Sequence, residues 1–255
     1  MIENNLRGVE QDDVALTPLV VEEVKDWIGS IWLEPEAVRT KIVERVCKTL
    51  EQKYDRPRLG NPERSIDDFI YIIISNRTSP VITQRVYANL RKRYCSWEDI
   101  LSAPRAELQT LLMPAGLSVK KSVQIEAALR KIKQDFGHCD LNSLQGKPEA
   151  EVHSYLTSLP GVSDKVAKCV MMYTLDAEVL PVDSHVYRVS KRLGWTSKKQ
   201  ANQSHEELEA LVPPQFRYAF HVDCIVHGRS VCRPKEPCCE QCCVRDDCKY
   251  NRSSN

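Results

Sequence analysis

The sequence predicts an almost entirely α-helical protein, and two observations support this prediction. Few segments alternate apolar and polar residues with the period of two that is typical of strands. Most segments instead repeat apolar residues at helical spacing, which gathers them on one face. We therefore expect roughly ten short helices, with no long repeat and no low-complexity linker. The clearest helical segments are 35–54, 65–75, 81–94, 96–102, 105–113, 119–136 and 147–158.

The N-terminal region divides into an extension and the start of the folded body. Residues 1–34 form the extension, in which Pro18–Trp32 has the pattern of an amphipathic helix. That helix either docks on the body or binds a partner, and docking is the simpler interpretation because an apolar face usually meets a core. The helix predicted at 35–54 is followed by a stretch, 55–63, with two prolines and a glycine, so we expect a loop there.

Length and charge exclude some classes of protein. The 255 residues suffice for one large domain or two modest ones. The formal net charge of +1 gives no overall basic signal for nucleic acid, although a local basic face is sufficient for an enzyme that visits one nucleotide. The longest apolar run, Phe69–Ser75, is too short to span a membrane, and the acidic N-terminus does not resemble a secretory leader. We expect a protein of the cytoplasm and nucleoid, or of the nucleus in a eukaryote.

The cysteines suggest a metal site. There are 11, an odd number, and in a reducing compartment the scattered ones are expected to be small buried apolar residues. The other six crowd between Cys232 and Cys248, which argues for metal binding rather than disulfides. The scattered cysteines are Cys47, Cys95, Cys139, Cys169 and Cys224.

Four cysteines of the C-terminal cluster have the spacing C-x6-C-x2-C-x5-C. Compact sets of thiolates hold either zinc or a cubane iron–sulfur cluster, and the spacing alone does not choose between them. Cys238 and Cys243 adjoin two of the four, so a shifted ligand register stays open. The expected ligands are Cys232, Cys239, Cys242 and Cys248.

The segment Leu156–Leu175 predicts a hairpin of two helices. Gly161 supplies the backbone conformation for a tight turn after the first helix, and Ser163 is a good N-cap for the second. The free N–H groups at such a helix start can hold a DNA phosphate without reading sequence. A plain αα-hairpin that packs for stability fits the turn equally well.

Lys165 and Asp183 are the candidate catalytic residues. Lys165 lies in the first turn of the second helix, where the helix dipole disfavours an ammonium ion, so we expect a lowered pKa. A neutral amine is what Schiff-base chemistry requires, although a solvated surface lysine would occupy the same position. Asp183 follows an apolar segment and has two compatible roles. It can take the amine's proton and stabilise a cationic sugar, or it can cap the helix that begins at Ser184.

Two further helices follow. Arg188, Lys191 and Arg192 share one face of the helix that Gly194 ends, and that face would suit a DNA backbone, although such faces are usually only solvated. The next apolar helix, Phe216–His227, is expected to end at a C-cap at Gly228. Its histidines, His221 and His227, are interpreted as structural or surface residues rather than metal ligands.

Three segments, LPGVSDK, PVDSHVYRVSKRLGW and HGRSVCRPKEPCCEQCCVRDDC, resemble in order and spacing the endonuclease III branch of the helix-hairpin-helix DNA glycosylases. The likeness covers residues 35–250 and leaves 1–34 outside. It implies an all-α fold of two helical domains with a DNA-binding cleft between them. A six-helix barrel with the hairpin would occupy 57–178, and 35–56 with 179–255 would form a domain around a [4Fe–4S] cluster. It also implies that Lys165 and Asp183 are the catalytic pair.

The resemblance also indicates residues that contact DNA. Asn76 stands where relatives have a glutamine that fills the gap left by the extruded base, and Leu117 matches a residue that wedges into the opposite strand. Asn76 and Ser79, which replaces a frequent acid, alter the family pattern near the base, while Ser163 and Asp164 alter the hairpin. The residues expected to contact DNA are Asn76, Leu117, Gly161, Ser163, His185 and Arg188.

The predicted function is base-excision repair. We expect a monomeric DNA glycosylase and abasic-site lyase that acts on double-stranded DNA, without a membrane, and removes an oxidised or otherwise modified pyrimidine through a lysine Schiff base. One alternative is a mismatch (G/T or G/U) or modified-cytosine glycosylase with the same fold. Another is an iron–sulfur protein that binds DNA without catalysis, against which Lys165 and Asp183 argue, since binding alone needs neither.

Overall fold

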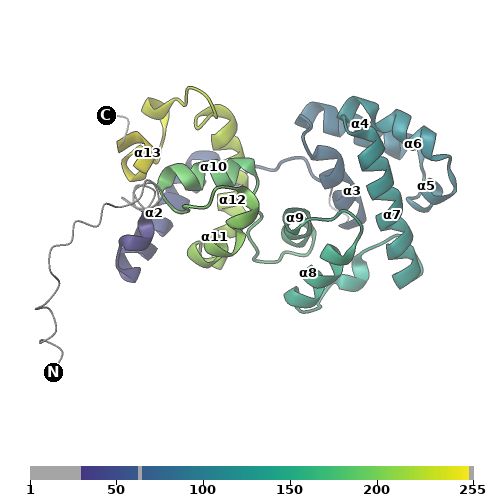
Figure 1. Cartoon of the computed structure of the whole chain (residues 1–255), viewed down its shortest axis with the longest axis horizontal. Coiled ribbons are helices and arrows are strands. Elements are labelled where there is room, and N and C mark those ends of the chain that lie inside the picture. The colour runs from purple at the N-terminus through teal and green to yellow at the C-terminus, as the bar shows by residue number, and fades with distance from the viewer. Residues whose placement is uncertain (1–29, 63–64, 253–255) are drawn as a thin grey trace, which may run out of the picture.

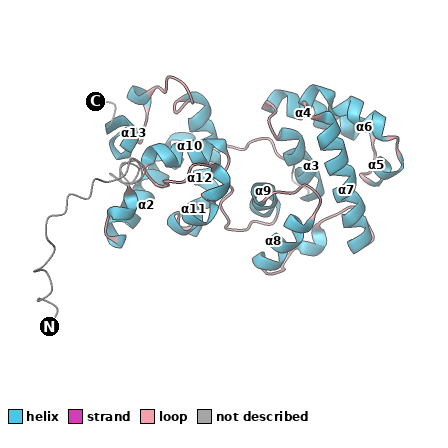
Figure 2. Cartoon of the chain, viewed as in Figure 1, coloured by secondary structure: helices cyan, strands magenta, loops and turns pink. Residues whose placement is uncertain are grey.

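The computed structural model describes residues 30–62 and 65–252. Within these ranges it contains helices and no strand, as Figure 2 shows, so the all-α prediction is confirmed. The α-helices are α2 (Glu36–Tyr54), α3 (Ser65–Ser75), α4 (Pro80–Arg93), α5 (Glu98–Ser102), α6 (Arg105–Leu112), α7 (Ser118–Phe136), α8 (Glu149–Ser158), α9 (Asp164–Thr174), α10 (Ser184–Leu193), α11 (His205–Leu211), α12 (Pro214–Ser230) and α13 (Lys249–Arg252). None of the described helices combines the length and apolar character that crossing a membrane requires.

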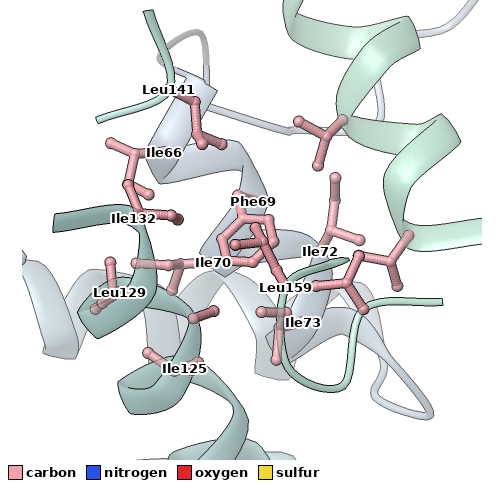
Figure 3. Close-up of a cluster of buried hydrophobic side chains, with 14 of the residues drawn as sticks. Ile66, Phe69, Ile70, Ile72, Ile73, Ile125, Leu129, Ile132, Leu141 and Leu159 are labelled. Atoms are coloured by element: carbon pink, nitrogen blue, oxygen red, sulfur yellow. The ribbon is translucent and has the colours of Figure 1, made fainter. Parts of the chain in front are cut away.

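One hydrophobic core lies around α3. Ile66, Phe69, Ile70 and Ile73 of this helix are buried, and helices α4 to α9 surround it. Figure 3 shows Phe69 and Ile70 meeting residues of α7 and the turn after α8. Because α3 is apolar almost all round, it is suited to a central position rather than to the surface.

A second core joins α2 to the C-terminal third of the chain. Helices α2, α10 and α12 pack together, and the rings of Trp195 and Phe220 stack at 5.2 Å. Figure 1 shows the two groups of helices at opposite ends of the long axis, with α8 and α9 beside the junction. Val179 is the last residue of the first core, and Leu180, which follows it, belongs to the second core. The assignment of two domains with the boundaries given above stays a prediction.

The end of the predicted N-terminal extension contacts the second core. Ile31 is buried, its N–H donates to Gly194 O at 3.1 Å, and the Trp32 indole donates to Trp195 O at 2.9 Å. Most of the helix predicted at Pro18–Trp32 lies outside the described residues.

The expected C-cap at Gly228 is wrong, because α12 continues to Ser230. A Cβ atom at Gly228 would lie 2.7 Å from His185 Nδ1 and 2.8 Å from an Arg188 guanidinium nitrogen. The glycine therefore permits the close approach of α10 to α12. Helix α11 was not anticipated, since its seven residues are too few for a clear apolar period.

Candidate active site

A cavity of about 620 Å³ lies between the two cores. Its walls come from the end of α3 and the following turn, from α9, from the start of α10 and from α12. The side chains that line it include Asn61, Asn76, Ser163, Lys165, Cys169, Tyr173, Asp183, His185 and His221.

The hairpin before α9 forms as the sequence predicts. Gly161 has φ +74°, a conformation that favours glycine, and the Ser163 hydroxyl accepts a hydrogen bond from Val166 N–H at 3.4 Å. Residues four apart on a helix share a face, so Lys165, Cys169 and Tyr173 all line the cavity. The predicted positions of the turn and the cap are confirmed, and the lysine faces a cavity rather than open solvent.

Asp183 both caps α10 and lines the cavity. Its Oδ1 accepts hydrogen bonds from the N–H groups of His185 and Val186, each at 2.8 Å. Burial by itself raises the pKa of Asp183, but His221, the backbone donor of Val186 and the Lys165 ammonium together hold that pKa below its ordinary value. Asp183 is therefore anionic at neutral pH. A fixed negative charge of this kind can stabilise a positively charged sugar.

The pKa of Lys165 does not shift in the expected direction. Burial lowers it, but Cys169, Asp183 and Asp68 outweigh burial, and the net pKa is raised. The prediction from the helix dipole alone is therefore wrong, because it left out acidic groups from two other segments. The resting amine is an ammonium ion, which must lose a proton before it can act as a nucleophile.

Asp68 is a residue of this region that the sequence reading did not single out. It is fully buried on α3, its Oδ1 accepts a hydrogen bond from Asn61 Nδ2 at 2.5 Å, and its Oδ2 has no described partner. Burial raises the pKa of Asp68 to about 7. The available signal was the pair of acids, Asp67 and Asp68, at the start of a strongly apolar helix, since buried carboxyl groups are rare unless they are paired.

His221 forms part of the opposite wall. Its Nδ1 donates to Pro181 O at 2.8 Å, and its ring meets the Tyr173 ring edge-on at 5.8 Å. Burial lowers the pKa of His221 to about 4, so the imidazole is neutral and Nε2 can accept a hydrogen bond. His221 was predicted to be a structural or surface residue, and it also lines the cavity.

Comparisons with known proteins agree with this geometry. Residues 70–214, more than half of the chain, match the family described as HhH-GPD superfamily base excision DNA repair protein. The chain belongs to this superfamily. It is 25% identical over 211 residues to endonuclease III of Thermotoga maritima, which covers 83% of this chain and 94% of that protein. A candidate DNA glycosylase of Arabidopsis thaliana is 29% identical over 168 residues, which cover 66% of this chain and only 57% of the plant protein.

A solved structure supports the fold of this superfamily member. An endonuclease III in a non-covalent complex with DNA superposes with a TM-score of 0.74 at 22% identity, covering 84% of this chain and 97% of that one. The prediction of an endonuclease III-like chain is confirmed.

The residues predicted to contact DNA in this HhH-GPD protein fall into two groups. Asn76, Ser163 and His185 line the same cavity as Lys165 and Asp183. Leu117 and Gly161 lie outside the cavity wall, and both are exposed. Contact of all five with DNA stays a prediction.

The basic side chains of α10 bind backbone carbonyl groups of this chain, a role that the sequence did not predict. The Arg188 guanidinium donates to Cys232 O at 2.9 Å and to Gly228 O at 2.8 Å, while Lys191 donates to Ser197 O at 2.9 Å. Arg192 similarly binds carbonyl groups of the C-terminal segment. The basic face of α10 therefore holds neighbouring backbone in place. Contact of Arg188 with DNA stays a prediction.

The surroundings of the C-terminal thiols bear on whether they can bind a metal. Burial raises the pKa of the Cys242 thiol to about 12, and Cys243, Cys248 and Cys232 contribute to that shift. Burial also raises the pKa of Cys248, to which Cys232 and Cys239 add. These shifts indicate that the four predicted ligands and Cys243 lie near one another. In the described chain no group of three or more His, Cys, Asp or Glu side chains is arranged to enclose a metal ion.

The two extra cysteines of the cluster face other groups. The Cys238 thiol lies 3.2 Å from an Arg233 guanidinium nitrogen. Burial raises the pKa of the Cys243 thiol, and the charges of Lys53 on α2 and Asp223 on α12 also act on it. Cys232, one of the expected ligands, has a similar contact, since an Arg192 guanidinium nitrogen lies 3.1 Å from its thiol. The ligand set Cys232, Cys239, Cys242 and Cys248 therefore stays a prediction.

The isolated cysteines mostly behave as predicted. Cys47, Cys139, Cys169 and Cys224 are buried, as expected for small apolar residues. Cys95 is exposed, so the prediction is wrong there.

Proposed function

We propose that this chain is a bifunctional DNA glycosylase and abasic-site lyase that removes an oxidised or otherwise modified pyrimidine from duplex DNA. The observation that supports this most strongly is the presence of Lys165 and Asp183 in one cavity between the two cores. A protein that only binds DNA needs neither an amine in the cavity wall nor a carboxylate beside it. The protein acts as a monomer in the compartment that holds DNA, either the nucleoid or the nucleus.

The reaction follows from the roles of these two side chains. The damaged nucleotide leaves the stack and enters the cavity, where the Asp183 carboxylate stabilises positive charge on the sugar. The Lys165 amine, after losing a proton, forms a bond to the sugar C1′ as the bond to the base breaks and the base leaves with the bonding electrons. The adduct opens to a Schiff base. Loss of a C2′ proton then expels the 3′ phosphate and cuts the strand.

We also propose that Cys232, Cys239, Cys242 and Cys248 hold a [4Fe–4S] cluster. The cluster stabilises the C-terminal segment, and no catalytic step is assigned to it. Purified protein is expected to be brown, and Cys239→Ser is expected to lose the visible absorption while Cys238→Ser keeps it. Iron and sulfide analysis provides the measurement. A colourless protein that contains zinc, or equal loss of colour in both variants, would contradict this ligand set.

The substrate is identified with a panel of duplexes. They carry thymine glycol, dihydrouracil, a guanine–thymine mismatch, 5-methylcytosine or an abasic site, and base release and strand cleavage are measured separately. Release of an oxidised pyrimidine followed by cleavage supports the proposal. Release of only thymine from the mismatch, or only 5-methylcytosine, would favour the alternative substrates. Neither release nor cleavage by folded, cluster-containing protein would indicate a DNA-binding protein.

A further inference from the structure

Two short loops that each contain a residue with left-handed backbone lie side by side, and the first of them lines the cavity that contains Lys165. The loop Ser75–Ser79 contains Arg77 at φ +56°, and the loop Met113–Leu117 ends at Leu117 with φ +52°. Side chains with a Cβ rarely adopt this conformation unless their surroundings impose it. The Thr78 hydroxyl links the loops through a 2.7 Å hydrogen bond to Ala115 O.

Lys121 on α7 binds both loops from beneath. Its side chain is 2% exposed. Its ammonium donates to Ile74 O at 2.8 Å, at the end of α3 just before the first loop, to Thr78 Oγ1 at 2.9 Å on that loop, and to Ala115 O at 2.9 Å on the second loop. The three N–H donors of the ammonium are thereby matched to three oxygens.

This arrangement is costly for a residue that only fills space. No described carboxylate contributes to the pKa of Lys121, and burial lowers that pKa to about 8, which still leaves the amine mostly charged at neutral pH. Burying a charge without a countercharge is unfavourable, whereas methionine would occupy the space without that cost. The charge is therefore explained by the three oxygens that it binds, one at the end of α3 and one on each loop, since an apolar side chain could not donate to them.

The two loops present side chains with complementary tasks. Asn76 lines the cavity that holds Lys165, while Leu117 is 49% exposed beside the exposed Met113 and Val119. Helix α7 also contacts the hairpin, because Gln124 Nε2 donates to Gly161 O at 2.8 Å. If a base is to be extruded, one side chain must fill its gap while another separates the strands, and both must enter the duplex at a fixed spacing.

We propose that Lys121 is a positioning residue for base extrusion, which fixes the loops Ser75–Ser79 and Met113–Leu117 so that Asn76 and Leu117 enter the duplex together. This inference rests on the proposed function. Lys121 touches neither the sugar nor the base, and it acts only through the two loops. Its loss should therefore impair extrusion far more than chemistry at a nucleotide that leaves the stack easily.

The test compares Lys121→Met with Lys120→Met, a loss of the neighbouring exposed lysine. Saturating enzyme is mixed with a duplex that contains the base lesion or, separately, an abasic site. Lys121→Met is expected to slow base release about 10²-fold, a cost typical of small misplacement, while abasic cleavage changes by less than about threefold. Lys120→Met should leave both rates close to wild type. Equal loss on both duplexes, or no loss on either, would overturn the inference.

A second measurement is independent of catalysis. A fluorescent base analogue, 2-aminopurine, placed beside the lesion brightens when stacking is lost, and it is followed in the Lys165→Ala background. Adding Lys121→Met is expected to abolish the signal at unchanged DNA affinity, and Lys121→Arg should restore part of it. An unchanged signal would overturn the inference even if the protein proves to have no lyase activity. Should Lys121→Met fail to fold, Thr78→Val takes its place, because it removes the hydroxyl that binds both Lys121 and Ala115. The expected and the contradicting results are then the same as for Lys121→Met.

Discussion

Helix α9 carries two lysines with opposite surroundings. Lys168 pairs with Glu209 and lies 3.9 Å from Asp164, beside a second cavity of about 550 Å³. Lys165, one turn earlier, faces the cavity between the cores and forms no such ion pair with a described carboxylate. The same residue type on one helix is thus held as a structural cation on one side and left available on the other.

The comparison shows what makes an amine a candidate nucleophile. The Lys168 nitrogen is occupied by its ion pair with Glu209, so it cannot readily attack a sugar. The charges near Lys165 raise its pKa but leave its nitrogen facing a space that can admit a nucleotide. Accessibility to substrate, and not a lowered pKa in the resting protein, distinguishes the two lysines.

Replacing each lysine in turn should give the largest difference. Lys165→Ala is expected to lower strand cleavage at an abasic site by at least about 10³-fold, because it removes the nucleophile, whereas Lys168→Ala keeps activity within about tenfold. Single-turnover cleavage on a gel measures both. Comparable losses in the two variants would show that the two faces of α9 are not functionally different.

Asp183→Asn tests the charge in the first cavity. The neutral amide is expected to reduce turnover by about 10²-fold to 10⁴-fold, since it cannot stabilise a cationic sugar or accept a proton. Asparagine caps helices as well as aspartate does, so the free energy of unfolding should change by less than about 1 kcal/mol. Single-turnover kinetics and urea unfolding separate the effects. Unfolding of the variant with normal activity per folded molecule would assign Asp183 to capping alone.

Asp68→Asn should reveal a carboxyl group that opposes folding at high pH. The pKa of Asp68 in the folded chain is about 7, above its ordinary value, so stability is full at low pH and falls as pH rises toward 7. Asparagine does not ionise and can still accept the bond from Asn61. The variant is expected to gain about 2 kcal/mol relative to wild type between pH 4 and pH 8 in urea unfolding. An equal difference at both pH values would contradict the burial argument.

Asp164→Asn should show the opposite and smaller pH dependence. On the Lys168 face, Asp164 Oδ2 lies 2.9 Å from His205 Nδ1 and Oδ1 lies 2.6 Å from His153 Nε2. His205 first, and His153 next, hold the pKa of Asp164 well below its ordinary value, so its stabilisation is present above pH 4 and lost as pH falls. Since the carboxylate is 40% exposed, the expected cost near pH 6 is only about 1 kcal/mol. The measurement is the melting temperature of the variant and of the wild type at both pH values. An equal difference between them at pH 6 and at pH 3 would argue against this pairing.

Local signals explain which features could be predicted from the sequence. The extent of α3, the turn at Gly161 and the caps at Ser163 and Asp183 depend on neighbouring residues, and each was correctly placed. The resemblance predicted that Lys165 and Asp183 act together, and both line one cavity.

Other features depend on segments that are distant in sequence. Burial lowers the pKa of Lys165, and Cys169, Asp183 and Asp68 raise it, the last two from segments outside α9. Arg188 binds carbonyl groups 40 and 44 residues further along, which no amphipathic pattern can reveal. The buried lysine at 121 likewise has partners that only the folded chain brings together.

The central claim is that Lys165 is the amine that bonds to DNA. Borohydride reduces a Schiff base to a stable amine, so an abasic duplex mixed with the protein and borohydride should give a covalent adduct. Digestion and mass spectrometry then locate the modified residue. The account predicts modification at Lys165, unchanged in Lys168→Ala and absent in Lys165→Ala. An adduct at Lys168 or at another amine, or no adduct from folded protein, would contradict it.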